Sequence, residues 1–71
     1  MRDQVLWRKT ARIITILANR LNLSQEQAMD LFYNSHTFEL FNNPESGLQL
    51  LSDEYIVNDT IKEIQEGHPV A

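Results

Sequence analysis

Hydrophobic residues recur at helical spacing along the first third of the chain. Over residues 3–21 they fall three or four positions apart, which places them on one face of an α-helix. This apolar face consists of Trp7, Ala11, Ile14, Ala18 and Leu21, and it is widened by Leu6, Ile13 and Leu17. Lys9 and Arg12 lie on the opposite face, where Ile16 is expected to be exposed. The pattern predicts one long helix whose apolar face packs into a core.

A second helix is predicted to begin in the segment NLSQEQA. Ser24 suits an N-cap, because its hydroxyl oxygen can accept hydrogen bonds from the first backbone N–H groups, and Gln27 completes a capping box. This helix is expected to run from residue 25 to about residue 34 and to bury Ala28, Leu31 and Phe32. The segment HTFELF, residues 36–41, is predicted to form a short helix.

The segment NNPESG, residues 42–47, is the clearest break in the helical pattern. Asn43 can cap a turn there, and Pro44 suits a first helical turn because it lacks the N–H group that would have no partner. Beyond this break, Leu48 and Leu51 are expected to reach the core.

The last helix is predicted to follow Ser52, which is expected to be its N-cap. Its buried stripe and flanking apolar residues are expected to be Val57, Ile61 and Ile64, with Tyr55 and Ile56. Gly67 is expected to end this helix, and residues 68–71 are expected to form a frayed tail.

These elements predict an all-α fold, a small bundle of three main helices plus one or two short helices, with no strands. The 71 residues are expected to form a single helical domain with an ordered core over residues 3–66. So short a chain buries only ~60% of the surface that its unfolded form exposes. Disulfides are excluded because there is no cysteine. Oligomerisation or partner binding is therefore the expected source of further stability.

The sequence also predicts a cytoplasmic protein without membrane contact. No apolar run approaches membrane-spanning length, and the segment MRDQVLWRKTAR has no signal-peptide core. The absence of cysteine suits a reducing compartment. Trp7 and Ile16 would suit a helix lying on a membrane, but the apolar face of this helix is needed for the core.

No group of residues predicts catalysis. His36 and Glu39 share a helical face, but a surface contact is a more ordinary interpretation than an acid–base pair. An acidic face of the last helix could attract a cation, yet it lacks the ligand pattern of a calcium loop. Its members are Asp53, Glu54, Asp59 and Glu63. We expect no enzyme activity, no cofactor and no bound metal.

Charge is distributed unevenly along the chain. Residues 1–20 hold five basic residues and one acidic residue, whereas residues 21–71 hold nine acidic residues and one basic residue. Such asymmetry can mark an interaction surface. Equally, the basic helix can neutralise the acidic remainder within one fold, and the sequence leaves both interpretations open.

Residues 21–41 have the helix–break–helix pattern of a DNA-binding helix-turn-helix but lack its basic residues. No lysine or arginine occurs between Leu21 and Leu51, and acidic residues there would face phosphate. The aromatic residues of the segment are interpreted as core residues: Phe32, Tyr33, Phe38 and Phe41. A DNA-associated transcriptional regulator that uses Arg8, Lys9 and Arg12 of the basic first helix is the alternative function.

The expected function is that of a noncatalytic protein–protein interaction module. Trp7, Ile16 and Tyr33 are apolar anchors of the kind that interfaces favour if they lie off the core face, with Arg8 and Arg12 beside them. Burial of Trp7 in the core is the competing interpretation. The partner is expected to be another protein or a second copy, since a homodimer would complete so small a core.

The segment LLSDEYIVNDTIKEIQ resembles the closing helix of a family of short bacterial proteins, domain-of-unknown-function family 3791. The residues that carry the resemblance are Ser52, Tyr55, Ile56, Val57, Asp59 and Ile61. The family has no established activity, and the resemblance implies a small helical cytoplasmic protein. Some members are encoded beside, or fused to, an ADP-ribosyltransferase-like family, which implies an antitoxin-like partner of a neighbouring toxin. No catalytic or binding residue is carried over.

Overall fold

The computed structural model describes the backbone of residues 2–66 and the side chains of residues 6–66, and its regular structure is helical throughout. The helices are α1 (Arg2–Leu21), α2 (Gln25–Tyr33), α3 (His36–Phe41) and α4 (Asp53–Glu66). Two 3₁₀ turns, η1 (Pro44–Ser46) and η2 (Leu48–Leu50), lie between α3 and α4. The predicted all-α bundle is confirmed. The expected helix stop at Gly67 and the tail over 68–71 lie outside the described residues.

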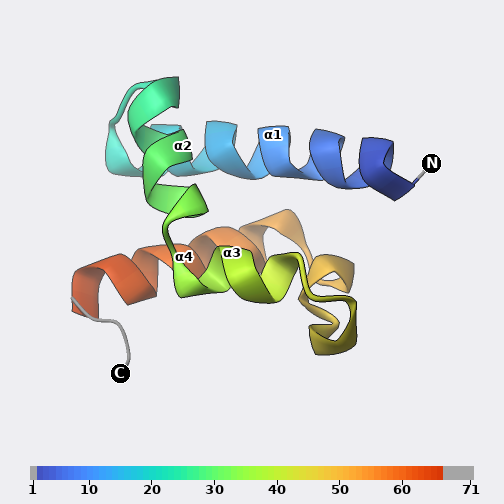
Figure 1. The fold of residues 1–71 in the computed structure, drawn as a ribbon. Coiled ribbons are helices and arrows are strands. Elements are labelled where there is room, and N and C mark those ends of the chain that lie inside the picture. The colour runs from blue at the N-terminus through green and yellow to red at the C-terminus, as the bar shows by residue number, and fades with distance from the viewer. Residues whose placement is uncertain (1, 67–71) are drawn as a thin grey trace.

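The helices form two sides joined by α2 (Figure 1). Helix α1 runs along one side, while α3 and α4 run along the other. Helix α2 crosses near the C-terminal end of α1 and leads down to α3. The N-terminal turns of α1 therefore extend past α2, and this overhang positions the surface described below.

The end of α1 is set by a left-handed residue that the sequence pattern did not reveal. Asn22 has a φ of 60°, and the N–H of Leu23 donates to the carbonyl oxygen of Ala18 at 2.8 Å. This is the hydrogen bond of a Schellman motif, and Asn is the residue that most often replaces Gly there. The tight turn reverses the chain directly into α2.

Helix α2 begins with the predicted capping box. The N–H of Gln27 donates to the Oγ of Ser24, and the N–H of Ser24 donates to the Oε1 of Gln27, both at 3.1 Å. At the other end, the buried hydroxyl of Ser35 donates to the carbonyl of Phe32 at 2.6 Å and accepts from the N–H of Phe38 at 3.1 Å. One serine therefore ends α2 and begins α3.

The break at residues 42–47 also forms as predicted. The Oδ1 of Asn43 accepts from the N–H of Glu45 at 3.0 Å, and Pro44 opens the first turn. Gly47 follows with a φ of 73°, which a residue with a Cβ adopts only at a cost. The predicted cap of α4 is present too, because the Oγ of Ser52 accepts from the N–H of Tyr55 at 3.1 Å.

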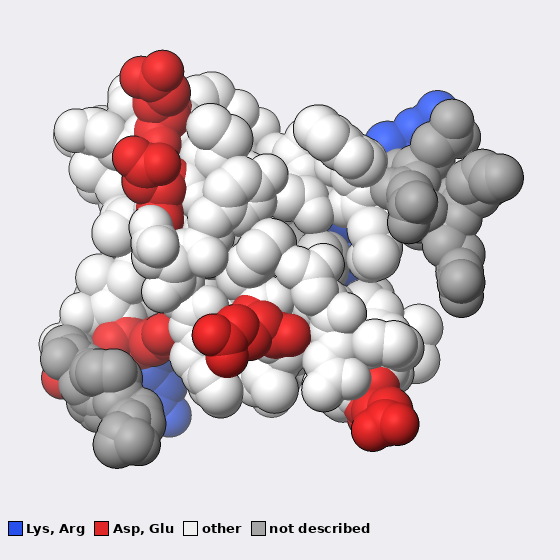
Figure 2. All heavy atoms as spheres, in the orientation of Figure 1, with Lys and Arg blue, Asp and Glu red and all other residues white. Residues whose placement is uncertain are grey.

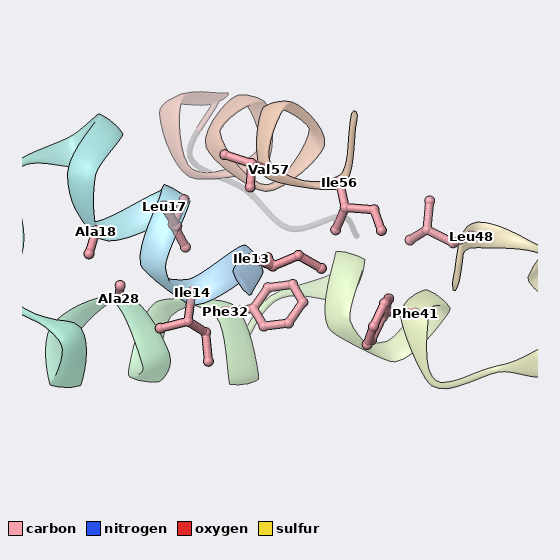
Figure 3. Close-up of a cluster of buried hydrophobic side chains, with 10 residues drawn as sticks. All are labelled: Ile13, Ile14, Leu17, Ala18, Ala28, Phe32, Phe41, Leu48, Ile56 and Val57. Carbon is pink, nitrogen blue, oxygen red and sulfur yellow. The ribbon is translucent and has the colours of Figure 1, made fainter. Parts of the chain in front are cut away.

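A single cluster of buried side chains joins all four helices (Figure 3). It consists of Ile13, Ile14, Leu17, Ala18, Ala28, Phe32, Phe41, Leu48, Ile56 and Val57. Phe32 contacts two other rings edge-on, with centroid distances of 5.2 Å to Phe38 and 5.9 Å to Phe41. Such edge-to-face pairs add to the apolar burial. Phe32 therefore links α2 to α3 as well as to α1.

Some side chains lie where the sequence did not predict them. Leu51 is exposed, because it follows the 3₁₀ turn η2 in an extended conformation that turns it away from Leu48. Ile16, expected to be exposed, is partly buried and packs against the core cluster. Thr60 is fully buried, and its hydroxyl is satisfied by donating to the carbonyl of Ile56 at 2.9 Å.

The central packing can be tested with the same substitution at two leucines. Leu17 is 0% exposed and Leu50 is 82% exposed. Leu17→Ala is expected to lower the free energy of unfolding by about 2–5 kcal/mol, because it leaves a cavity in the core. Leu50→Ala should change it by less than about 0.5 kcal/mol. Urea denaturation followed by circular dichroism measures both, and equal losses would contradict this packing.

Candidate interaction surface

Trp7 lies exposed where α1 extends past α2, and two depressions adjoin it. Its exposed fraction is 72%, so most of the indole contacts solvent. The first depression, about 320 Å³, lies between α1 and α3 and is lined by Leu6, Trp7, Thr10, Tyr33, Phe38 and Asn42. We call the residues lining this depression and its neighbour the Trp7–Tyr33 surface.

The second depression lies between α1 and α2 and measures about 250 Å³. It shares Trp7, Thr10 and Tyr33 with the first, and Ala11, Ile14, Gln25, Glu26 and Met29 complete it. The two hollows are therefore neighbours with common walls. Glu26 is the only charged residue among the described residues that line them.

Tyr33 is held in place by the aromatic core. Its ring centroid lies 4.8 Å from that of Phe38 and 6.4 Å from that of Phe32, yet 43% of the residue is exposed. Phe32 and Phe41 are core residues as predicted, and Phe38 is partly buried against the core. The prediction of Tyr33 as a core residue is wrong, because it ends α2 at the edge of the aromatic cluster.

On the side of α1 that faces α4, basic residues bind a carboxylate. The Nζ of Lys9 lies 2.7 Å from Oδ1 of Asp53, and the Nε of Arg12 lies 2.7 Å from Oδ2. Lys9 also donates to the carbonyl oxygen of Leu51 at 2.8 Å. The hydrogen bond from Arg12, followed by that from Lys9, lowers the pKa of Asp53 despite partial burial. For Lys9 and Arg12, the interpretation of neutralisation within the fold is confirmed.

A carboxylate of α4 also caps α3. The Oε2 of Glu63 accepts from the N–H of His36 at 2.7 Å, and Oε1 accepts from the N–H and hydroxyl of Thr37 at 3.1 and 2.9 Å. Burial raises the pKa of Glu63, but these hydrogen bonds outweigh it, so the pKa is lowered overall. A carboxylate at a helix N-terminus is stabilised by the helix dipole. Asp53 and Glu63 thus bind neighbouring helices instead of forming one solvated acidic face.

Only part of the predicted partner-binding set comes together. Trp7 and Tyr33 line the same two depressions. Arg12 turns toward Asp53, although over half of its side chain remains exposed, and Ile16 packs on the core. Arg8 is exposed and lines neither depression. Thr10 and Phe38 line the surface but were not predicted, because only the tertiary fold places α3 beside the start of α1.

The helix pair α2–α3 does not present a basic surface. The N-terminal N–H groups of α3 are occupied by Glu63. Nearby, the Nδ1 of His36 lies 3.6 Å from the Oε1 of Glu39, and both side chains are mostly exposed. This is the expected surface contact between a histidine and a glutamate.

Two other kinds of site, a metal centre and a membrane-spanning helix, are absent from the described residues. Over this part of the chain, no three His, Cys, Asp or Glu side chains are grouped closely enough to hold a metal ion. None of the described helices combines the length and apolar character needed to cross a membrane. No family model, curated protein or solved structure matches the chain.

The two carboxylates of α4 predict acid sensitivity. Asp53 and Glu63 both have a lowered pKa in the folded protein, so the unfolded chain binds more protons as the pH falls. Their stabilisation is complete above their ordinary pKa values of 3.8 and 4.5 and is lost as the pH falls through the lower, folded-state values. Thermal unfolding measured between neutral and acidic pH should show this loss.

A double variant isolates this contribution. Asp53→Asn with Glu63→Gln is expected to cost about 1–3 kcal/mol at neutral pH and to flatten the acid dependence. The matched control, Glu45→Gln with Glu54→Gln, removes the same charge from two exposed residues. If the control changes the pH profile as much as the double variant does, general charge and not these contacts controls acid stability.

Proposed function

We propose that this protein is a noncatalytic module that binds another protein through the Trp7–Tyr33 surface. The observation that carries the proposal is a 72%-exposed tryptophan beside two depressions whose described lining residues carry one charge, that of Glu26. Exposing an indole to water is unfavourable, and covering it would release that cost. Tryptophan and tyrosine are also the residues that most often dominate binding energy at interfaces.

The polar groups of the protein support a binding role over a catalytic one. Asp53 and Glu63 are engaged in holding helices together, and His36 lies at an exposed position beside Glu39. Among the residues whose side chains the structure describes, no histidine, lysine, serine or cysteine lines either depression. General acid–base catalysis needs such groups within hydrogen-bond reach of a substrate. An antitoxin that binds its toxin, as the family resemblance implies, would be one example of such a binding module.

Nucleic-acid binding is the less favoured alternative. Lys9 and Arg12 are paired with Asp53, and Arg20 donates to the Oδ1 of Asn58 at 2.7 Å. Lysine and arginine side chains supply most of a protein's nonspecific affinity for nucleic acid. Here a nucleic-acid phosphate would first have to displace the contacts that these three side chains already make. Capture that disappears after nuclease treatment would favour this alternative.

The proposal predicts that Trp7 contributes to binding and little to folding. Tagged protein is used to capture partners from a nuclease-treated extract of the source cells. The Trp7→Ala variant is expected to capture at least tenfold less of the partner than the unchanged protein does, because truncating a residue that dominates an interface costs much of the affinity. The unfolding free energy should fall by less than about 1 kcal/mol, because the side chain is mostly exposed.

Tyr55→Ala is the matched control. Tyr55 is 51% exposed and lines neither depression, so its loss should leave capture unchanged. Equal capture by all three proteins would contradict a binding role for Trp7. A strongly destabilised Trp7→Ala variant that still captures its partner would assign Trp7 to the core.

A further inference from the structure

The charges around the Trp7–Tyr33 surface differ from those elsewhere on α1. Glu26 lines the second depression, and Asp30 follows it by four residues, so both lie on the stripe of α2 that leads to Tyr33. Figure 2 shows carboxylates over α2, over α3 and beside the turn after α3, with a largely uncharged area between them. Among the described residues, α2 and α3 contain no lysine or arginine. The surface is thus apolar at its centre and acidic along the α2 and α3 side.

The shape of the surface suits two adjacent apolar side chains. The two depressions, about 320 and 250 Å³, share Trp7, Thr10 and Tyr33 as a common wall. Side chains three or four residues apart on a helix lie next to each other on one face, so they could enter both hollows together. An extended peptide would bind by β-augmentation, which requires an exposed strand edge on the protein. The described elements are helical and offer no such edge.

We infer that the Trp7–Tyr33 surface binds a short amphipathic helix of another protein, with two apolar anchors and with lysine or arginine where it passes α2. This inference rests on the proposed function and names its partner class. Basic residues on the partner would meet Glu26 and Asp30, and such complementarity selects partners and speeds association.

The same charges oppose other occupants. A second copy would bring its own net charge of −4, and it would place its own Glu26 and Asp30 near the acidic side of this surface. Juxtaposed like charges disfavour such a pairing. Anionic lipid headgroups and nucleic-acid phosphates would meet the same carboxylates. A basic helix is the occupant that both the apolar centre and the acidic side favour.

Trp7 is the only tryptophan of the chain and reports on its own coverage. The probe is a helical peptide of about 14 residues, without tryptophan, with leucines at positions i, i+3, i+4 and i+7 and lysines on its polar face. Its matched control has glutamate in place of each lysine. The lysine peptide is expected to shift Trp7 emission to shorter wavelength, and the glutamate peptide is expected to bind at least tenfold more weakly.

Two protein variants then distinguish local charge from net charge. Glu26→Gln with Asp30→Asn is expected to weaken binding of the lysine peptide by roughly three- to tenfold. Glu54→Gln with Glu66→Gln removes the same charge from exposed positions of α4, which lines neither depression, and should change affinity by less than about twofold. Equal loss in both double variants, or equal affinity for both peptides, overturns the inference.

The remaining outcomes separate this inference from the proposed function. Absence of any emission change with the lysine peptide overturns the basic-helix partner, while capture that depends on Trp7 would still support the binding surface. Sedimentation equilibrium of the unchanged protein and of the Trp7→Ala variant, each without peptide, tests whether two copies of the chain dimerise through this surface. A dimer abolished by this substitution would replace the inferred partner with another copy of the chain.

Discussion

Burial of Ile13 and Leu17 fixes the rotation of α1 about its own axis, and the exposed surface of the protein follows from that rotation. Both residues are completely buried, and each fully buried aliphatic side chain contributes about 1.5–3 kcal/mol. At 100° per residue, Trp7 lies about 140–160° around the helix from Lys9 and Arg12. Once the basic pair faces Asp53 on α4, Trp7 must face away from it, toward α2 and α3.

The polar contacts around this core specify how the helices meet and also add stability. Asp53 binds two basic residues of α1, and Glu63 caps α3 from α4. A partly exposed ion pair contributes little, but an unpaired carboxylate in the same place would be costly. Both contacts involve α4, so this helix aligns the two others that border the first depression. Asp53 and Glu63 are occupied by these contacts, whereas Glu26 and Asp30 of α2 are exposed.

The proposed binding role is consistent with the small size of the domain. A chain of 71 residues has little apolar area to bury, and α1 is longer than the part that α2 covers. Where α1 extends past α2, Trp7 is exposed and adjoins the two depressions, at a cost in apolar surface left in contact with water. Natural domains commonly accept such a cost where a partner covers the surface.

Local signals determined the helices and their starts. Capping at Ser24, Asn43 and Ser52 was predictable because a cap depends on residues only two or three positions away. Most of the core followed from helical periodicity for the same reason. The exposure of Trp7, the partial burial of Ile16 and the pairing of Asp53 were decided only by tertiary packing. The apolar stripe of α1 is wider than the surface that packs against it, so the sequence pattern is compatible with several rotations of α1 about its axis. Contacts of Lys9 and Arg12 with Asp53, over 40 positions away in the chain, select one of these rotations.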